Sequence, residues 1–152
     1  MAEKYREMGK AADGMRTGAE ALKEAREIWD RIRSDSADGL KWAWFTLEGT
    51  NYVCKTSGNT SLDGFAAAGS QATDSVWFGA FRTTNPATKF IQVLLVPEGI
   101  SPLKRGKAQL QKAAIFNAWP GANGEASITS ADEDILRESL AKICGCKPSD
   151  LC

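Results

Sequence analysis

The residue types that most often perform chemistry are sparse in this chain of 152 residues, which has four cysteines and no histidine. Histidine is the commonest general base, the usual partner of a nucleophilic serine or cysteine, and the commonest metal ligand. An enzyme built on this sequence would have to use carboxylates, lysines or a cofactor, and these residues form no clustered acid–base or nucleophile site. We therefore predict a binding protein that is not an enzyme and carries no cofactor.

Three of the cysteines crowd the C-terminus, at Cys144, Cys146 and Cys152. A zinc site would need a further ligand from the distant Cys54 or from a carboxylate, and the spacing matches no CxxC pair. The N-terminal residues are charged and lack the apolar centre of a signal peptide, and no stretch approaches the roughly 20 apolar residues of a membrane span. We expect reduced thiols, no metal site and a cytoplasmic location.

Charge is balanced overall but unevenly distributed along the chain. The 19 basic and 19 acidic residues argue against a protein that coats nucleic acid. Residues 101–120 hold four basic and no acidic side chains, whereas residues 121–152 hold three basic and six acidic ones. The positive segment is therefore the first candidate for a binding surface.

This positive segment is predicted to be a helix, because Ser101 is a good N-cap and Pro102 suits the first helical position. At about 100° per residue its bases gather on or beside one face, and its apolar residues lie opposite, where they can pack on a sheet. The bases are Lys104, Arg105, Lys107 and Lys112, and the apolar residues are Leu103, Leu110, Ala113 and Ala114.

The basic face of this helix has two interpretations. It is an ordinary solvated surface, as most charge runs are, or a docking face for an acidic partner. Bases in the first turn oppose the helix dipole, which prefers acids there, and a broken local rule favours the second interpretation.

Hydrophobic periodicity and turn residues predict the elements that position this helix. We expect helices over residues 18–34, 60–71 and 102–119, and a last one from a capping box at Ser130–Glu133 to Gly145. Strands are expected over residues 40–47, 52–55, 75–83, 89–96 and 125–129, with 89–96 at the centre of the sheet. This order predicts a sheet covered by helices on both faces. Residues 1–16, which mix charges with glycines, are predicted to be a mobile or loosely helical extension.

Two tryptophans, Trp42 and Trp44, lie two residues apart in a predicted strand and must share a face of the sheet. We favour burial of both under a helix, as for Trp29 and Trp77, which lie on apolar patterns. The alternative is an exposed platform on which a ligand stacks.

Several sequence blocks stand in a characteristic order. Lys89-Phe90 opens an apolar strand, Pro97-Glu-Gly follows it, and Ser101-Pro-Leu-Lys-Arg-Gly-Lys107 opens the long helix. These blocks resemble the actin-depolymerising-factor homology domain, and among its members coactosin and coactosin-like proteins. Agreement in order and spacing extends to the blocks Ile32–Asp35, Lys41–Thr46, Val76–Thr84 and Ile128–Glu133. The likeness covers roughly residues 17–143.

The resemblance implies an α+β fold: a single domain over residues 17–144 with a central mixed sheet of five or six strands, flanked by helices on both faces. Residues 145–152 would then be a C-terminal tail. The resemblance also implies binding to actin and, for coactosins, to the side of actin filaments. The implied actin-binding residues are Lys89, Lys104, Arg105, Lys107 and Lys112, with Arg82 as a further candidate.

The sequence departs from cofilins at the features that serve severing and phosphoregulation. The first serine is Ser34, so the early serine of the cofilin N-terminus is missing, and Ala108-Gln-Leu-Gln111 replaces the cofilin Met-Tyr-Ala-Ser-Ser stretch. We expect a monomer that prefers filaments. The open alternatives are a cofilin-type depolymerising or severing factor and a phosphoinositide-binding module that uses the same basic helix.

Overall fold

The computed structural model describes residues 20–34 and 39–152. The predicted extension over residues 1–16 lies outside the described residues. The four α-helices of the described part are α2 (Lys23–Arg33), α3 (Leu62–Gly69), α4 (Pro102–Asn117) and α5 (Glu133–Cys144). The strands are β1 (Trp42–Glu48), β2 (Asn51–Gly58), β3 (Trp77–Arg82), β4 (Phe90–Leu95) and β5 (Gly124–Ile128), and a short 3-10 helix, η2, covers Pro148–Asp150.

The five strands form one mixed sheet in the order β2-β1-β3-β4-β5. All neighbours are antiparallel except β4 and β5, which are parallel because α4 carries the chain back along the sheet between them. The central strand is β3. The strand predicted at the centre, β4, lies one place away, buried between β3 and β5.

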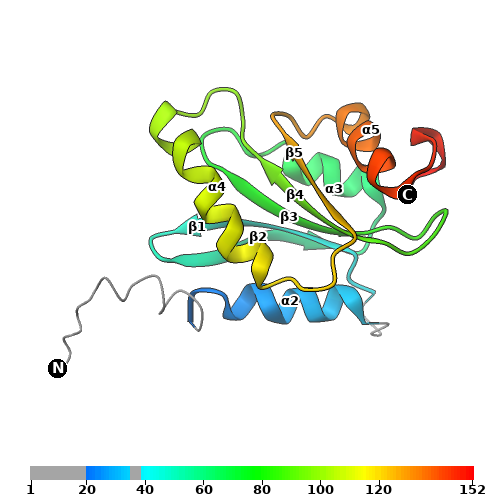
Figure 1. The fold of residues 1–152 in the computed structure, drawn as a ribbon, viewed down its shortest axis with the longest axis horizontal. Coiled ribbons are helices and arrows are strands. Elements are labelled where there is room, and N and C mark those ends of the chain that lie inside the picture. Colours follow the sequence, from blue (N-terminus) through cyan, green and yellow to red (C-terminus); the bar gives the residue numbers. More distant parts are fainter. Residues whose placement is uncertain (1–19, 35–38) are drawn as a thin grey trace.

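Each face of the sheet has its own hydrophobic core under a pair of helices, as predicted. Alternate residues of β1 supply both cores: Ala43 and Phe45 pack with α2 and α4, whereas Trp42 and Trp44 pack with α3 and α5. Figure 1 shows α4 crossing one face of the sheet, with α3 and α5 behind it. The side-chain period of two therefore decides which helices each strand residue contacts.

Trp42 and Trp44 are both buried, which confirms the favoured interpretation and leaves no exposed stacking platform at this pair. The Trp44 ring stacks on Phe65 of α3 at a centroid distance of 4.3 Å, and its Nε1–H donates to the Phe65 carbonyl at 2.9 Å. Gly79 pairs with Trp44 across β1 and β3, and a Cβ there would lie 2.6 Å from the indole. The glycine makes room for the buried ring.

Three helix ends were predicted from their capping residues, and two of these are confirmed. Ser101 caps α4 by accepting from the Lys104 N–H at 3.3 Å, and Gly145 ends α5 in the left-handed conformation at φ 67°. The capping box at Ser130 was wrong by two residues. Asp132 is the N-cap of α5 and accepts from the N–H groups of Asp134 and Ile135, because a carboxylate competes well with a hydroxyl for that position.

The predicted C-terminal tail, residues 145–152, packs against the domain. Leu151 is buried in the core beneath α5, and Arg137 donates to the carbonyls of Pro148 and Leu151. The backbone of Cys152 also bonds with Asn85 in the loop between β3 and β4. These contacts hold the last residues beside the start of β4.

Candidate functional site

The C-terminal half of α4 is firmly anchored to the sheet. Ile115 and Phe116 are buried, and the Phe116 ring stacks on Trp119 at 5.6 Å. Gln92 of β4 donates its amide to the carbonyls of Phe116 and Trp119, both at 3.0 Å, at the end of the helix. The Phe116 carbonyl also accepts from the Trp119 N–H at 3.1 Å. These contacts fix the end of the helix on the sheet.

A second polar anchor holds the middle of α4. The hydroxyl of Tyr52 on β2 donates to the Gln111 carbonyl at 2.8 Å. Burial raises the pKa of Tyr52 from its ordinary value of 10 to about 12, so the hydroxyl remains a donor into a more alkaline range than an exposed tyrosine would. The helix is thus tied to an edge strand as well as to the sheet centre.

The N-terminal half of α4 projects from the body. Every residue from Ser101 to Lys107 is exposed, and the first buried side chain of the helix is Ala108. Leu103 is 68% exposed and Leu110 is 79% exposed. The prediction that these leucines pack on the sheet, with Ala113 beside them, is wrong, since Ala113 is exposed as well; only Ala114 is partly buried.

The leucines point outward because the other side of α4 packs on the sheet. That side carries Ala108, Ile115 and Phe116, and the Phe116 ring buries more apolar area than a leucine in its place would. Lys104 and Lys112 lie one helical turn before and after Ala108, so these bases flank the side of the helix that contacts the sheet. The face turned away from the body is the apolar one, with Leu103, Leu110 and Gly106.

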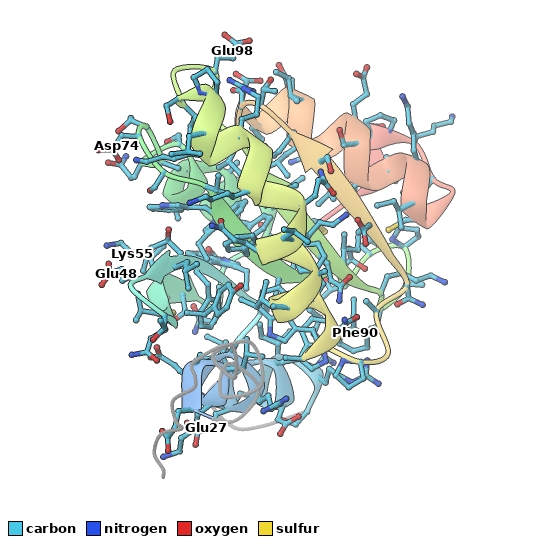
Figure 2. The ribbon with its side chains drawn as sticks, turned by 60° about the vertical axis from the view of Figure 1, so that its left-hand side comes forward. Glu27, Glu48, Lys55, Asp74, Phe90 and Glu98 are labelled. Carbon is cyan, nitrogen blue, oxygen red and sulfur yellow. The ribbon has the colours of Figure 1, made fainter. Side chains whose placement is uncertain are left out.

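The bases of the first turn are held in place by backbone carbonyls of two neighbouring loops. Lys104 donates its Nζ to the Asp74 carbonyl at 2.7 Å, and Arg105 donates Nη2 to the carbonyls of Glu98 and Ile100 at 3.2 and 3.5 Å. Figure 2 shows Asp74 and Glu98 at the same end of the molecule as the start of α4. The carbonyls orient both charges without neutralising them.

The other two bases of the segment differ from each other. Lys112 forms an ion pair with Glu125 of β5 at 2.6 Å, and only 20% of its side chain is exposed. Lys107 is exposed and makes no hydrogen bond or ion pair with the described residues. The local positive charge therefore rests on Lys104, Arg105 and Lys107. These bases and the two leucines lie on different sides of the helix, and we call the exposed surface that Leu103, Lys104, Arg105, Lys107 and Leu110 form around the first turns of α4 the α4 face.

A hollow of about 390 Å³ lies beside the first half of the helix. Leu47, Val76, Lys104 and Lys107 are among the residues that line it. The remaining lining residues are Thr46, Gly49, Ser75, Leu103 and Gln111, so no acidic side chain is among the described residues that line it. The hollow can accept an anionic group.

Lys89 and Arg82 lie away from the α4 face. Lys89 immediately precedes β4 and Ser101 follows its far end, and a strand of six residues spans about 20 Å. Figure 2 shows Phe90, the next residue, at the other end of α4 from Glu98. The structure therefore does not bring Lys89 together with Lys104.

Arg82 has a structural role that its sequence position did not reveal. Its guanidinium donates to the carbonyls of Ile32 and Ser34 at 2.9 and 3.0 Å, where α2 ends, and lies 5.6 Å from the centre of the Phe90 ring. It satisfies carbonyls that the helix itself leaves without donors.

The cysteines form no metal site in the described part of the chain. All four are free, and no three His, Cys, Asp or Glu residues there are grouped to hold an ion. Burial and the neighbouring Cys146 raise the pKa of the Cys144 thiol, and the charge of Lys89 partly offsets this. In residues 20–34 and 39–152, no helix combines the length and the apolar character that crossing a bilayer requires.

The exposed leucines are the functional candidates that the sequence reasoning missed. Both were assigned to the sheet side because they lie opposite the bases on a helical wheel. The signal that could have found them is the position of Ile115 and Phe116, which fixes the buried side of the wheel and turns Leu103 and Leu110 outward.

Comparisons with known proteins agree on one fold. A family model described as cofilin/tropomyosin-type actin-binding protein matches residues 18–144. The NMR structure of human coactosin-like protein is 22% identical with a TM-score of 0.67, over 85% of this chain and 93% of that one. Coactosin from Entamoeba histolytica is 20% identical with a TM-score of 0.67, over 84% of this chain and 96% of that one. Cofilin from Streptomyces griseoflavus is 17% identical with a TM-score of 0.66, over 79% and 94%. No curated protein matches the chain.

Proposed function

The chain belongs to the family of cofilin/tropomyosin-type actin-binding proteins, and from that premise we propose that it binds the side of actin filaments in the coactosin manner, through the α4 face and without catalysis. Such a protein works at the actin cytoskeleton in the cytoplasm and modulates filament dynamics. The competing proposal is cofilin-type depolymerisation or severing.

The observation that carries the proposal is the exposure of two leucines within a segment, residues 101–120, that holds four bases and no acids. Full burial of a leucine in an interface stabilises a complex by about 1.5–3 kcal/mol, so exposed leucines on a rigid helix suit the centre of a contact. Bases around them steer an acidic partner and fix its orientation. Actin has an acidic surface, which matches this pattern.

Each base contributes differently in this proposal. Lys104 and Arg105 are preoriented by their carbonyl partners, and Lys107 is available to the partner without losing an existing contact. Lys112 contributes less because Glu125 already neutralises it. Arg82 is placed outside the contact, since its guanidinium supports the end of α2.

Lys89 is assigned to a second contact in the filament. Lys89 and the start of α4 lie at opposite ends of β4, about 20 Å apart along the strand, which is too far for one small patch, but neighbouring subunits of a filament can engage two separate patches. Loss of Lys89 should therefore weaken filament binding and leave binding to an actin monomer unchanged.

Co-sedimentation with filamentous actin at low salt tests the proposal. We expect the protein to pellet, and the double reversal Lys104→Glu/Arg105→Glu to release it. The matched control is Lys23→Glu/Lys142→Glu, which makes the same change in charge on α2 and α5. Binding should weaken as salt rises. Failure to pellet with filaments in excess, or equal release by the control pair, would overturn the proposal.

Filament length separates the coactosin-type function from the cofilin-type one. A side-binding protein leaves filament length unchanged at saturation, whereas a severing factor shortens filaments under the microscope. Shortening by the wild-type protein would favour the cofilin-type alternative.

The hollow beside Lys104 and Lys107 favours one second function, binding of an anionic phosphoinositide headgroup. Flotation with liposomes that contain or lack a phosphoinositide tests it. Equal flotation with both would exclude the headgroup as the ligand.

A further inference from the structure

Ser101 combines a sequence signal with an exposed position. It is the only serine or threonine in the whole sequence that is followed by proline, and Lys104 stands three residues after it. Serine-proline with a base at the third following position is the pattern that proline-directed protein kinases of the cyclin-dependent class recognise, through the proline ring and the positive charge. The pattern is absent from every other part of the chain.

The segment around Ser101 is open to such an enzyme. Residues 101–107 are all exposed, and among the described residues the serine side chain has one hydrogen-bond partner, the Lys104 N–H at 3.3 Å. Ser101 is already extended, with φ −62° and ψ 152°. Gly106 lies in the interior of the helix, where glycine is a poor helix former, so the first turns can open locally and present the serine-proline segment in extended form.

We propose that Ser101 is a phosphorylation site for a proline-directed kinase and that its phosphate releases the acidic partner from the α4 face. The release rests on the proposed function; the modification does not. The Ser101 hydroxyl oxygen attacks the γ-phosphorus of a nucleoside triphosphate. The bond from that phosphorus to the β,γ-bridging oxygen breaks, the nucleoside diphosphate leaves, and the serine proton passes to the kinase base.

The structure explains why this phosphate would act on binding and not on the fold. A phosphoserine carries about −1.5 to −2 charges at neutral pH, against the three positive charges of Lys104, Arg105 and Lys107. Its oxygens can accept from the same N–H groups that the hydroxyl serves now, and a negative group suits the N-terminus of a helix. The helix stays capped while the face loses most of its attraction for an acidic surface.

The test uses the full chain, purified cyclin-dependent kinase and ATP, with mass spectrometry to locate the phosphate and co-sedimentation to measure binding. The matched control is Ser101→Asn, which keeps a neutral N-cap and cannot be phosphorylated. We expect one phosphate on Ser101 in the wild-type chain, none in Ser101→Asn or at Ser101 in Pro102→Ala, and filament binding about tenfold weaker after phosphorylation. Kinase-treated Ser101→Asn should pellet like the untreated wild-type chain.

Each failure has a distinct meaning. A wild-type Ser101 left unmodified by the kinase overturns the site. Full phosphorylation with unchanged pelleting overturns the release. If the untreated chain does not pellet, the proposed function fails and the release with it, while the modification is still decided by mass spectrometry. Gly106→Ala should slow phosphorylation by up to about fivefold, and an unchanged rate would overturn the local opening.

Discussion

The two halves of α4 differ in almost every respect, although they form one continuous helix. The C-terminal half is bound to the sheet by Phe116 and by the Gln92 amide, whereas the N-terminal half contacts the body mainly through the side chains of Lys104 and Arg105. Ile115 and Phe116 near the end of the helix are buried in the fold, whereas Leu103 and Leu110 nearer its start are left exposed. The anchored half supplies rigidity and the projecting half supplies a surface, which is what a helix that docks into a partner requires.

The largest expected effect comes from removing the anchor. Phe116→Ala should lower the free energy of unfolding by about 3–5 kcal/mol, because it removes the ring that stacks on Trp119 and leaves a cavity. Denaturant titration measures the loss. A change below about 1 kcal/mol would mean that the two halves are anchored alike.

Truncation of an exposed leucine should weaken filament binding and leave the free energy of unfolding almost unchanged. Leu110→Ala should change the free energy of unfolding by no more than about 0.5 kcal/mol, since the side chain is 79% exposed. Filament binding should weaken by about 1.5–3 kcal/mol, roughly tenfold or more, if the leucine is buried by the partner. Gln109→Ala, at the exposed residue directly before Leu110, is the control and should bind normally. Strong destabilisation by Leu110→Ala would contradict the division between the halves.

The buried amide of Gln92 tests the polar part of the anchor. Gln92→Leu keeps the approximate volume but removes the side-chain donor from the carbonyls of Phe116 and Trp119, at a cost of about 1–3 kcal/mol. The Phe116 carbonyl keeps the Trp119 N–H as a donor at 3.1 Å, so the Trp119 carbonyl loses more. Denaturant titration should show this loss, with filament binding at saturation unchanged as long as the helix remains folded. If Gln92→Leu leaves the free energy of unfolding unchanged, the end of α4 is held on the sheet by hydrophobic packing alone.

The hydroxyl of Tyr52 gives a smaller effect with a defined dependence on pH. The folded pKa of about 12 lies above the ordinary value of 10, so the proton is held more tightly in the folded state. Its contribution is complete below pH 10 and is lost as the pH rises from 10 toward 12. Tyr52→Phe should cost about 1 kcal/mol at pH 7, and the gap to the wild-type chain should narrow above pH 10. Unfolding measured in denaturant at pH 7 and pH 11 checks this, and a gap that does not narrow would exclude titration of the phenol.

The smallest effect is expected in the projecting half itself. A Cβ at Gly106 meets nothing within 4 Å, so Gly106→Ala should stabilise the protein by up to about 1 kcal/mol. Thermal unfolding of the wild-type and variant chains measures the difference. Destabilisation would show that the first turns of α4 need the freedom of glycine.

Much of the fold was predictable because local patterns and tertiary packing agree. The period of two in β1 placed Trp42 and Trp44 on one face, and Ser101 and Gly145 marked helix ends through local hydrogen bonding. The cap at Asp132 was missed because two suitable oxygens lie two residues apart, and only the path of the backbone chooses between them. The central position of β3 was missed because apolar content alone does not distinguish two buried strands.

The candidate site was predictable in composition and not in orientation. The absence of acids around Lys104, Arg105 and Lys107 is a property of the sequence, as is the match to the actin-binding family. The side of α4 that faces the sheet was not predictable from the sequence. Most of the bases lie opposite the leucines on the helical wheel, and a lysine can pack its aliphatic chain against the sheet while its ammonium group reaches water, so either side could face the sheet. Two further contacts were not predictable because they join residues distant in the chain: the ion pair of Lys112 with Glu125 and the hydrogen bonds of Arg82 to the end of α2.

The sequence by itself therefore determined that the protein has no histidine chemistry, where its helices and strands lie, and that one helix carries an unbalanced positive charge. Only the tertiary structure decided that Phe116 and its neighbours take the sheet side, which turns Leu103 and Leu110 outward and leaves Lys104 and Arg105 along the flanks. The physical reason is that periodicity fixes how residues are arranged around a helix axis, whereas the rotation of the helix about that axis is set by which side chains pack best against the rest of the molecule.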